Sequence, residues 1–217
     1  MNDFASGAAA AQMLLAACAN GPVTCDEGRI VRFPVGYSAG DDRIMGFESV
    51  VEGKLRTITI ADSGGFQETE GYSVAAQVVP PIRQRISWVY GNNDALAIGA
   101  LQALTENGLE PNKDVMVVGG TCHGDSTHLV NGDLVGTAIQ PAFLEGWLWV
   151  QTLHKFPKTG TVIPGELQLA ADPVTPPSDE GAPHQFNFML NPVIEPNQAS
   201  YDESTIWGYS MQKLCDY

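Results

Sequence analysis

Residues 89–120 read VYGNNDALAIGALQALTENGLEPNKDVMVVGG and contain a complete strand–helix–strand repeat. Asn93 or Asp94 can cap the start of the helix, and Asp94 is the preferred choice. Gly108 follows the helix, where a left-handed residue commonly ends one. The second strand, 115–118, has four apolar residues in a row, which suits a strand that is buried on both faces of a parallel sheet. This stretch predicts an α/β fold.

The same alternation of strands and helices continues on both sides of this repeat. Besides 88–90, the apolar patterns predict strands at 29–37, 55–61 and 134–139. They predict helices at 4–19, 42–51, 70–85, 123–131 and 142–154, with Pro80-Pro81 ending or bending the third of these. This order of elements is typical of an α/β protein with a parallel sheet.

Composition limits the classes of partner. The chain has 217 residues, 44% of them hydrophobic, so it can bury a sizeable core. It carries 11 basic against 25 acidic residues, a formal net charge of −14. Because such a field repels phosphate backbones and anionic lipids, we expect neither a nucleic-acid partner nor a membrane-surface partner.

The segment 4–25 contains no charged residue and has the length of a membrane-spanning helix. Gln12, Gly21 and Pro22 interrupt its apolar character, however, and Asp3 is the sole charge before it, whereas a secretory signal needs a basic start. We therefore predict a packed amphipathic helix that is not inserted in a membrane.

The four cysteines lie at wide spacing and form no C-x-x-C pair, so the sequence supports no metal site. An even count fits two disulfides in an oxidising compartment, and four free buried thiols are the alternative. Cys18 and Cys25 are close enough to pair if the segment between them turns. Cys122 and Cys215 would then pair by elimination alone.

Several blocks occur in the order of one known family. Besides 89–120, they are NDFASGAAAAQMLL (2–15), GYSAGDDRIMGF (36–47), GGFQETEGYSV (64–74) and GDLVGTAIQPAFLEG (132–146). Together they resemble the type I periplasmic sugar-binding proteins, the ribose-binding-like solute-binding components of ABC transporters. The similarity spans about two-thirds of the chain, from residue 2 to 150.

The resemblance implies a fold and a domain organisation. In that family an N-terminal lobe is followed by a crossing into a C-terminal lobe and then by a return. This sequence starts at the first crossing. We therefore expect the parallel-sheet, three-layer lobe of the type I periplasmic binding protein fold, with the N-terminal lobe largely missing. Residues 1–140 would form the C-terminal ligand-binding lobe, and 141–217 a returning segment with a Pro-rich irregular tail.

The resemblance also implies ligand-binding residues. Arg43 matches the family's sugar-binding arginine, whose planar fork of donors suits adjacent hydroxyls; the alternative is a surface pair with Asp41 or Asp42. Phe66 matches an aromatic residue that stacks on the apolar face of a sugar. Asn93 matches an asparagine that donates to and accepts from ligand hydroxyls.

Three further positions match less closely. Gln140 matches a ligand glutamine at the later hinge, and Asn2 stands near a polar residue of the first hinge. Thr121 occupies the place where sugar binders commonly have an aspartate, although a hydroxyl cannot accept two hydroxyl bonds as a carboxylate does. Asp125 is the nearby carboxylate that we consider as a replacement.

The resemblance implies a solute-binding protein of an ABC importer, exported to the periplasm. It would bind a sugar-like ligand and then a membrane permease, without chemistry and without a cofactor, and export favours the two disulfides. The alternative is the effector-binding domain of a lac-repressor-type regulator. A cysteine hydrolase is disfavoured, because adjacent Cys122 and His123 cannot easily face one reacting atom. In a complete two-lobed protein we expect Arg43→Ala and Phe66→Ala each to weaken ligand binding with thermal stability nearly unchanged.

Overall fold

The structure, a computed structural model, describes residues 3–123 and 125–140 together with 142, 146, 150, 205–206, 209–210, 212 and 215. The helices are α1 (Asp3–Asn20), α2 (Ser38–Val51), α3 (Glu68–Val78), the 3₁₀ turn η1 (Pro80–Ile82), α4 (Asp94–Glu106) and α5 (Thr127–Val130). The strands are β1 (Glu27–Arg32), β2 (Arg56–Asp62), β3 (Ile86–Gly91), β4 (Met116–Val118), β5 (Thr205–Ile206) and β6 (Tyr209–Ser210).

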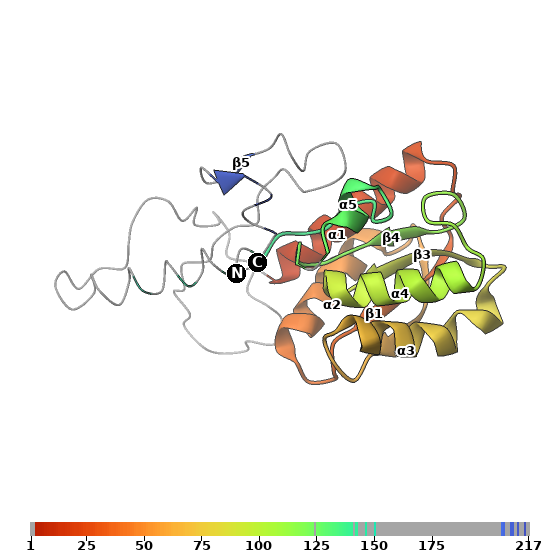
Figure 1. Ribbon diagram of the computed structural model, residues 1–217, viewed down its shortest axis with the longest axis horizontal. Coiled ribbons are helices and arrows are strands. Elements are labelled where there is room, and N and C mark those ends of the chain that lie inside the picture. The colour runs from red at the N-terminus through yellow and green to blue at the C-terminus, as the bar shows by residue number, and fades with distance from the viewer. Residues whose placement is uncertain are drawn as a thin grey trace.

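Four parallel strands in the order β2-β1-β3-β4 form the central layer. Helices α1 and α2 pack together on one face, and α3 and α4 pack together on the other (Figure 1). Each helix pair covers its own hydrophobic cluster, one centred on Leu14 and Phe47 and the other on Leu96 and Leu104. The expected three-layer α/β lobe is confirmed.

Strands β3 and β4 are buried on both faces. Trp88, Tyr90 and Met116 point into the cluster under α1 and α2, whereas Val89 and Val117 point into the cluster under α3 and α4. Because side chains alternate along a strand, a run of apolar residues fills both layers at once. The prediction from residues 115–118 is confirmed.

The predicted strand 29–37 is shorter than expected. β1 ends at Arg32, and the amide of Tyr37 then donates to the carbonyl of Pro34 in a turn that leads into α2. Pro34 has no amide hydrogen to donate, so the ladder cannot continue through it.

The predicted strand 134–139 is wrong. Its pairing with β4 consists of one bridge, between Val118 and Gly136, although Leu134 and Ile139 are buried. β4 ends at Val118. The amide of Gly119 still donates to the carbonyl of Gly136 at 3.0 Å, but the amides of Gly120, Thr121 and Cys122 donate to the side chain of Asp94 in α4.

Two helix predictions were too long. α3 ends at Val78 before Pro80 begins η1, so the two prolines end the helix as expected. The helix predicted at 123–131 is reduced to α5. The helix predicted at 142–154 is described at positions 142, 146 and 150, which are helical, and the rest of it and the Pro-rich tail lie outside the described residues.

The N-terminal segment forms α1, which packs on α2 and buries Ala10, Ala11 and Leu14 against the sheet. Among the helices that the structure describes, none combines the length and apolar character that crossing a bilayer requires.

Both expected disulfides are present, Cys18–Cys25 and Cys122–Cys215. The first fixes the end of α1 to the segment that leads into β1. The second joins the loop after β4 to a position 93 residues later.

We expect the chain isolated from an oxidising compartment to be four hydrogens lighter than its reduced form, because two disulfides remove four thiol hydrogens. Intact mass spectrometry with and without reductant measures this difference. Equal masses would show four free thiols and would favour the intracellular regulator.

Candidate functional site

The carboxyl ends of the four parallel strands bring the predicted site residues to one edge of the sheet. Phe33 follows β1, Phe66 follows β2, Asn93 follows β3, and the loop 119–123 follows β4. Ligands of open α/β sheets commonly bind at this edge. Arg43, from the first half of α2, reaches the same edge.

Arg43 is buried, with 2% of its surface exposed, and its guanidinium is held from three directions. Its Nε donates to Asp3 Oδ1 at 2.8 Å, its Nη1 to the carbonyl of Asn92 at 2.9 Å, and its Nη2 to Gln140 Oε1 at 2.9 Å. Arg43 and Gln140 are therefore brought together as predicted.

The surface-pair alternative for Arg43 does not hold with Asp41, which pairs with Arg32 instead. The ion pair that Arg43 does form is with Asp3, in the first turn of α1. Arg43→Ala removes the donor to Asp3, Asn92 and Gln140. Because losing the partner of a buried polar group costs free energy, the substitution should lower stability as well as weaken binding. This changes the expectation drawn from the sequence.

Three aromatic rings form a cluster beside Arg43, which we call the aromatic cluster: Phe33, Tyr37 and Phe66. Their centroids are 4.9–5.5 Å apart. The Arg43 guanidinium lies 5.5 Å from the centroid of the buried Phe33 ring. Phe66 is 39% exposed and Tyr37 48% exposed, so both offer ring surface to a ligand.

Asn93 caps the start of α4, a role that was predicted for its neighbour Asp94. Its Oδ1 accepts from the amide of Leu96 at 2.8 Å, which makes Asn93 the cap of α4, and its Nδ2 donates to the carbonyl of Phe66 at 2.8 Å. The choice of Asp94 as the cap is wrong. The Asn93 side chain thus fixes both the helix and the loop that carries Phe66.

Asn92 was missed from the sequence. It is fully buried, its Oδ1 accepts from the amide of Phe33, and its Nδ2 donates to the carbonyl of Gly40. These bonds join the ends of β1 and β3 to α2 and thereby place Arg43. Its position directly after a buried strand was the available signal, but the ligand role at this point of the chain was assigned to its neighbour Asn93.

Asp94 organises the loop after β4. Its Oδ1 accepts from the amides of Gly120 and Thr121 at 3.0 Å and of Cys122 at 3.2 Å, and from the Thr137 hydroxyl at 2.6 Å. Burial raises the pKa of Asp94 to about 6, and these hydrogen bonds oppose that rise. The carboxylate therefore fills a nest of backbone amides.

Thr121 is buried at the centre of this loop. Its hydroxyl lies 3.4 Å from the amide of Asp94, and its carbonyl accepts from the amide of Gln140 at 2.9 Å. Its side chain therefore faces the start of α4. Its predicted contact with a ligand stays a prediction.

His123 lies next to the site. Its Nε2 is hydrogen-bonded to the carbonyl of Gln140. Burial, together with the charge of Arg43, lowers the pKa of His123 to about 4. The neutral imidazole therefore donates to the carbonyl at neutral pH and supports the segment that carries Gln140.

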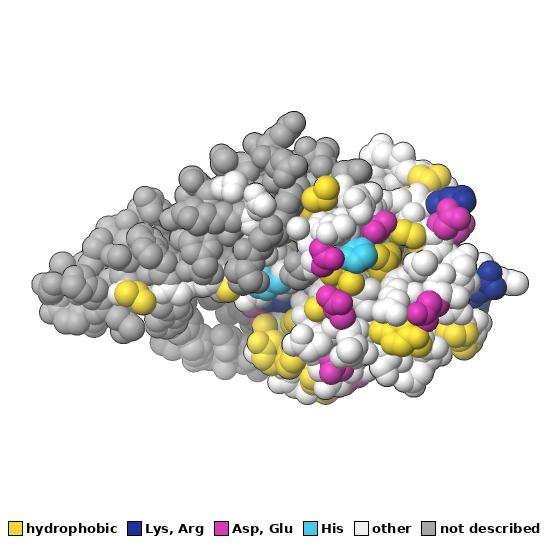
Figure 2. All heavy atoms as spheres, in the orientation of Figure 1, with side chains coloured by type: hydrophobic (Ala, Val, Ile, Leu, Met, Phe, Trp, Pro, Cys, Tyr) yellow, Lys and Arg dark blue, Asp and Glu magenta, His cyan; other side chains and the backbone are white. Residues whose placement is uncertain are grey.

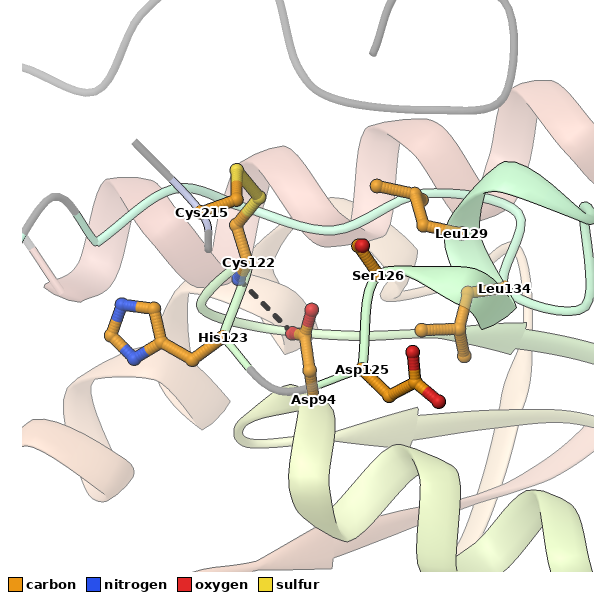
Figure 3. Close-up of a pocket in the computed structure, with 8 residues that line it drawn as sticks. All are labelled: Asp94, Cys122, His123, Asp125, Ser126, Leu129, Leu134 and Cys215. Atoms are coloured by element: carbon orange, nitrogen blue, oxygen red, sulfur yellow. Dashed lines mark hydrogen bonds between the residues drawn. A yellow bond between two sulfur atoms is a disulfide. The ribbon is translucent and has the colours of Figure 1, made fainter. Parts of the chain in front are cut away.

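A small cavity of about 10 Å³ lies behind the loop, lined by Asp94, Asp125, Ser126, Leu129, Leu134 and the Cys122–Cys215 disulfide (Figure 3). It has the size of a single water molecule. The sulfur of Cys122 is bonded to Cys215 and is not a thiol nucleophile. Asp125 accepts from the amide of Thr127 and faces this cavity, so it does not replace the missing carboxylate.

No group of three metal-ligating side chains was found in the described part of the chain. Asn2 lies outside the described residues, and its predicted contact stays a prediction.

Comparison with known proteins gives one family. The model of a periplasmic binding protein domain matches residues 1–158. The galactofuranose-binding protein YtfQ of Escherichia coli is 31% identical over 147 residues, 62% of this chain and 43% of the relative. The ribose import binding protein RbsB of Bacillus subtilis is 33% identical over 84 residues, 39% of this chain and 26% of the relative. The chain therefore spans less than half the length of these relatives.

Solved structures show the same fold. A galactofuranose-binding protein superposes with a TM-score of 0.65 and 24% identity over 76% of this chain and 55% of that chain. The binding component of the arabinose ABC transporter from Shewanella sp. ANA-3, bound to L-arabinofuranose, superposes with a TM-score of 0.63. It is 24% identical, and the match covers 73% of this chain and 52% of that chain.

Proposed function

This chain belongs to the periplasmic binding protein domain family, and from this premise we propose that it binds a neutral sugar for an ABC importer. The observation that supports this most is the meeting of Arg43 and Gln140 beside the aromatic cluster, at the carboxyl edge of the sheet. A sugar has the two matching surfaces, a rim of hydroxyls and an apolar face of C–H groups.

Each part of the site has a role in this proposal. The Arg43 guanidinium, which already donates to Asp3, Asn92 and Gln140, offers its second Nη1 hydrogen to a ring hydroxyl. The exposed face of Phe66 packs on the apolar side of the sugar. Asn93 keeps the Phe66 loop in place. Binding of this kind breaks no bond, so the protein acts by capturing the ligand and presenting it to a permease.

The two disulfides support export over an intracellular role. Disulfides persist in oxidising compartments such as the periplasm and are rare in the cytosol. They favour the binding protein over the lac-repressor-type regulator that shares the fold.

The described residues supply one wall of the proposed site, so the affinity of this chain alone should be low. A micromolar binder has about −8 kcal/mol of binding free energy. If half of the contacts come from this wall, about −4 kcal/mol and a millimolar dissociation constant follow. Binding is therefore best measured by NMR chemical-shift titration, which detects weak complexes.

We expect Phe66→Ala to weaken binding of the best sugar by about 3- to 10-fold, the effect of losing one aromatic packing contact. Titration of ¹⁵N-labelled chain with galactose, arabinose, ribose and glucose gives the dissociation constants. The melting temperature should fall less than in Arg43→Ala, because Phe66 is 39% exposed whereas Arg43 is buried.

Val35→Ala is the matched control, since Val35 is exposed on the same edge and lies outside the aromatic cluster. Its affinity should equal that of the wild type. No shift of Arg43 or Phe66 signals with any sugar would contradict the proposed function.

A further inference from the structure

An open groove of about 640 Å³ lies at the amino ends of β3 and β4, at the edge of the sheet opposite the proposed sugar site. Its walls come from the segments 22–24, 83–87, 108–109 and 113–114. Arg83, Arg85 and Lys113 line it, and we call it the basic groove. The acidic lining residue among those described is Asp114. The six residues of β3, at about 3.3 Å each, put about 20 Å between the two edges.

This gathering of positive charge runs against the composition of the chain. The sequence has 11 basic residues against 25 acidic ones, so most of its surface should be negative. In Figure 2 the larger dark blue areas of the described surface lie at the right-hand end, which is where α4 ends in Figure 1. Because a cleft lined by one sign of charge concentrates the opposite charge, the basic groove should attract an anion although the whole chain repels it.

Arg83 is the cation of the groove with the most donors to spare. Its side chain is exposed and forms no hydrogen bond or ion pair with the part of the chain that the structure describes. Its guanidinium lies beside Gly108, where an added Cβ atom would be 3.2 Å from Nη2 of Arg83. Gly108 follows the C-terminal cap of α4, and the helix dipole favours a cation at that end. This position keeps the guanidinium in the groove.

The other two cations are weakly engaged. Arg85 Nη1 is 3.6 Å from Glu27 Oε2, an oxygen that Arg56 already holds at 2.6 Å. Lys113 pairs with Glu110 at 2.6 Å, but their side chains are 66% and 64% exposed, and exposed pairs contribute little. Both cations can therefore turn to a ligand, and Glu27 keeps Arg56 as its partner.

The backbone around the groove is fixed in place. The disulfide at the end of α1 holds one wall, and the amide of Asp26 donates to Ser87 Oγ at 2.8 Å, which ties this wall to β3. On the opposite wall Asp114 Oδ2 accepts from the amide of Glu110 at 2.8 Å, so this carboxylate is engaged in a turn. The groove is thus formed before any ligand arrives.

The kind and number of donors indicate a phosphate group. Two guanidinium groups and one ammonium group supply three positive charges and more hydrogens than the two oxygens of a carboxylate can accept. A phosphate monoester carries a charge of about −1.5 to −2 at pH 7 and three strong acceptor oxygens. The volume of the groove also leaves room for the organic part of a small ester.

We propose that the basic groove is a second ligand site, which binds the phosphate group of a small soluble phosphate compound. Arg83, Arg85 and Lys113 contact the phosphate oxygens. The net charge of −14 keeps the chain away from anionic lipids, so a lipid headgroup is not the source of the phosphate. The groove and the sugar site lie at opposite edges of the sheet, so each can be tested without the other.

Titration of the ¹⁵N-labelled full chain with inorganic phosphate and with glycerol 3-phosphate tests this inference. Both should shift the amide signals of residues 83–87 and 108–114, whereas sodium chloride at the same ionic strength should not. Arg83→Gln and Arg85→Gln should each weaken phosphate binding by about 10-fold, the effect of one charge-assisted hydrogen bond.

Lys54→Gln is the matched control. It removes one positive charge from an exposed position at the same edge of the sheet, but beside β2, at the far end of the strand order from the groove. Its phosphate affinity should equal that of the wild type. Melting temperatures measured alongside show whether each variant is folded.

The outcomes are distinct. Absence of shifts with both phosphate compounds, or equal losses of affinity in Lys54→Gln and the two groove variants, would overturn the inference and leave the proposed sugar site untouched. Vesicles of phosphatidylglycerol, with phosphatidylcholine as the neutral control, test a lipid as the source, and we expect no binding to either. Binding to the anionic vesicles that Arg83→Gln abolishes would refute the soluble ligand.

Discussion

Asp94→Ala is expected to lower the free energy of unfolding by about 3–5 kcal/mol at pH 7.5. The substitution removes the acceptor of two buried amides, Gly120 and Thr121, which have no other partner of this kind among the described residues. Each buried donor left unsatisfied costs about 1–3 kcal/mol. Cys122 is less affected, because its amide also donates to the Thr137 hydroxyl at 3.0 Å. Urea unfolding followed by circular dichroism measures the loss.

Asp94→Asn is the matched control, because it keeps an Oδ1 acceptor in the same place and should cost much less. A loss below about 1 kcal/mol in Asp94→Ala would show that the amides find other partners, since one orphaned amide alone costs that much. The loop would then be held by the Cys122–Cys215 disulfide and not by the carboxylate.

The pH dependence of Asp94 has a definite sign. Its pKa in the folded chain is about 6, above the value of about 3.9 for an unfolded aspartate. The folded state therefore binds the proton more tightly, and this contribution to stability is complete below pH 4 and lost as the pH rises through 6. Asp94→Asn lacks a titrating group, so its stability relative to wild type should improve between pH 4 and pH 7.

The order of strands and helices was predictable because each element carries a strong local signal. The run Val115–Val118 fills both faces of a buried strand, and Gly108 adopts a φ of +73° after α4. The strand at 134–139 failed, because the same apolar alternation also suits an extended segment that is buried without a ladder. A local apolar pattern does not determine which groups pair with the backbone amides and carbonyls of a segment.

The site was predictable as a set of residues but not as a network. Arg43 and Gln140 were identified by resemblance, and the hydrogen bond between their side chains shows that they lie together in the structure. The pair of Arg43 with Asp3 joins residues 40 positions apart, and the nest around Asp94 joins positions up to 43 apart. Such partners depend on how the helices pack, which a single sequence does not encode in any local spacing.

Gly46→Leu is the second large effect that we expect, a loss of about 3 kcal/mol or more, or failure to fold. α1 and α2 cross so closely that a Cβ atom on Gly46 would collide with the carbonyl of Phe4, and one on Gly7 with the carbonyl of Arg43. Inserting extra atoms into a packed interior costs about 1–3 kcal/mol even where side chains can shift, and here the obstacle is backbone. The two helices would have to separate.

Separation of these helices would also disturb the site, since Asp3 is the first residue of α1 and its partner Arg43 lies on α2. We therefore expect any folded fraction of Gly46→Leu to have lost the Asp3–Arg43 pair that holds the guanidinium in place. Ser49→Leu is the matched control, because it places the same side chain on the exposed face of α2. Thermal unfolding of both variants measures the difference. Equal melting temperatures would show that the close crossing of α1 and α2 is not required, and that the position of Asp3 has another cause.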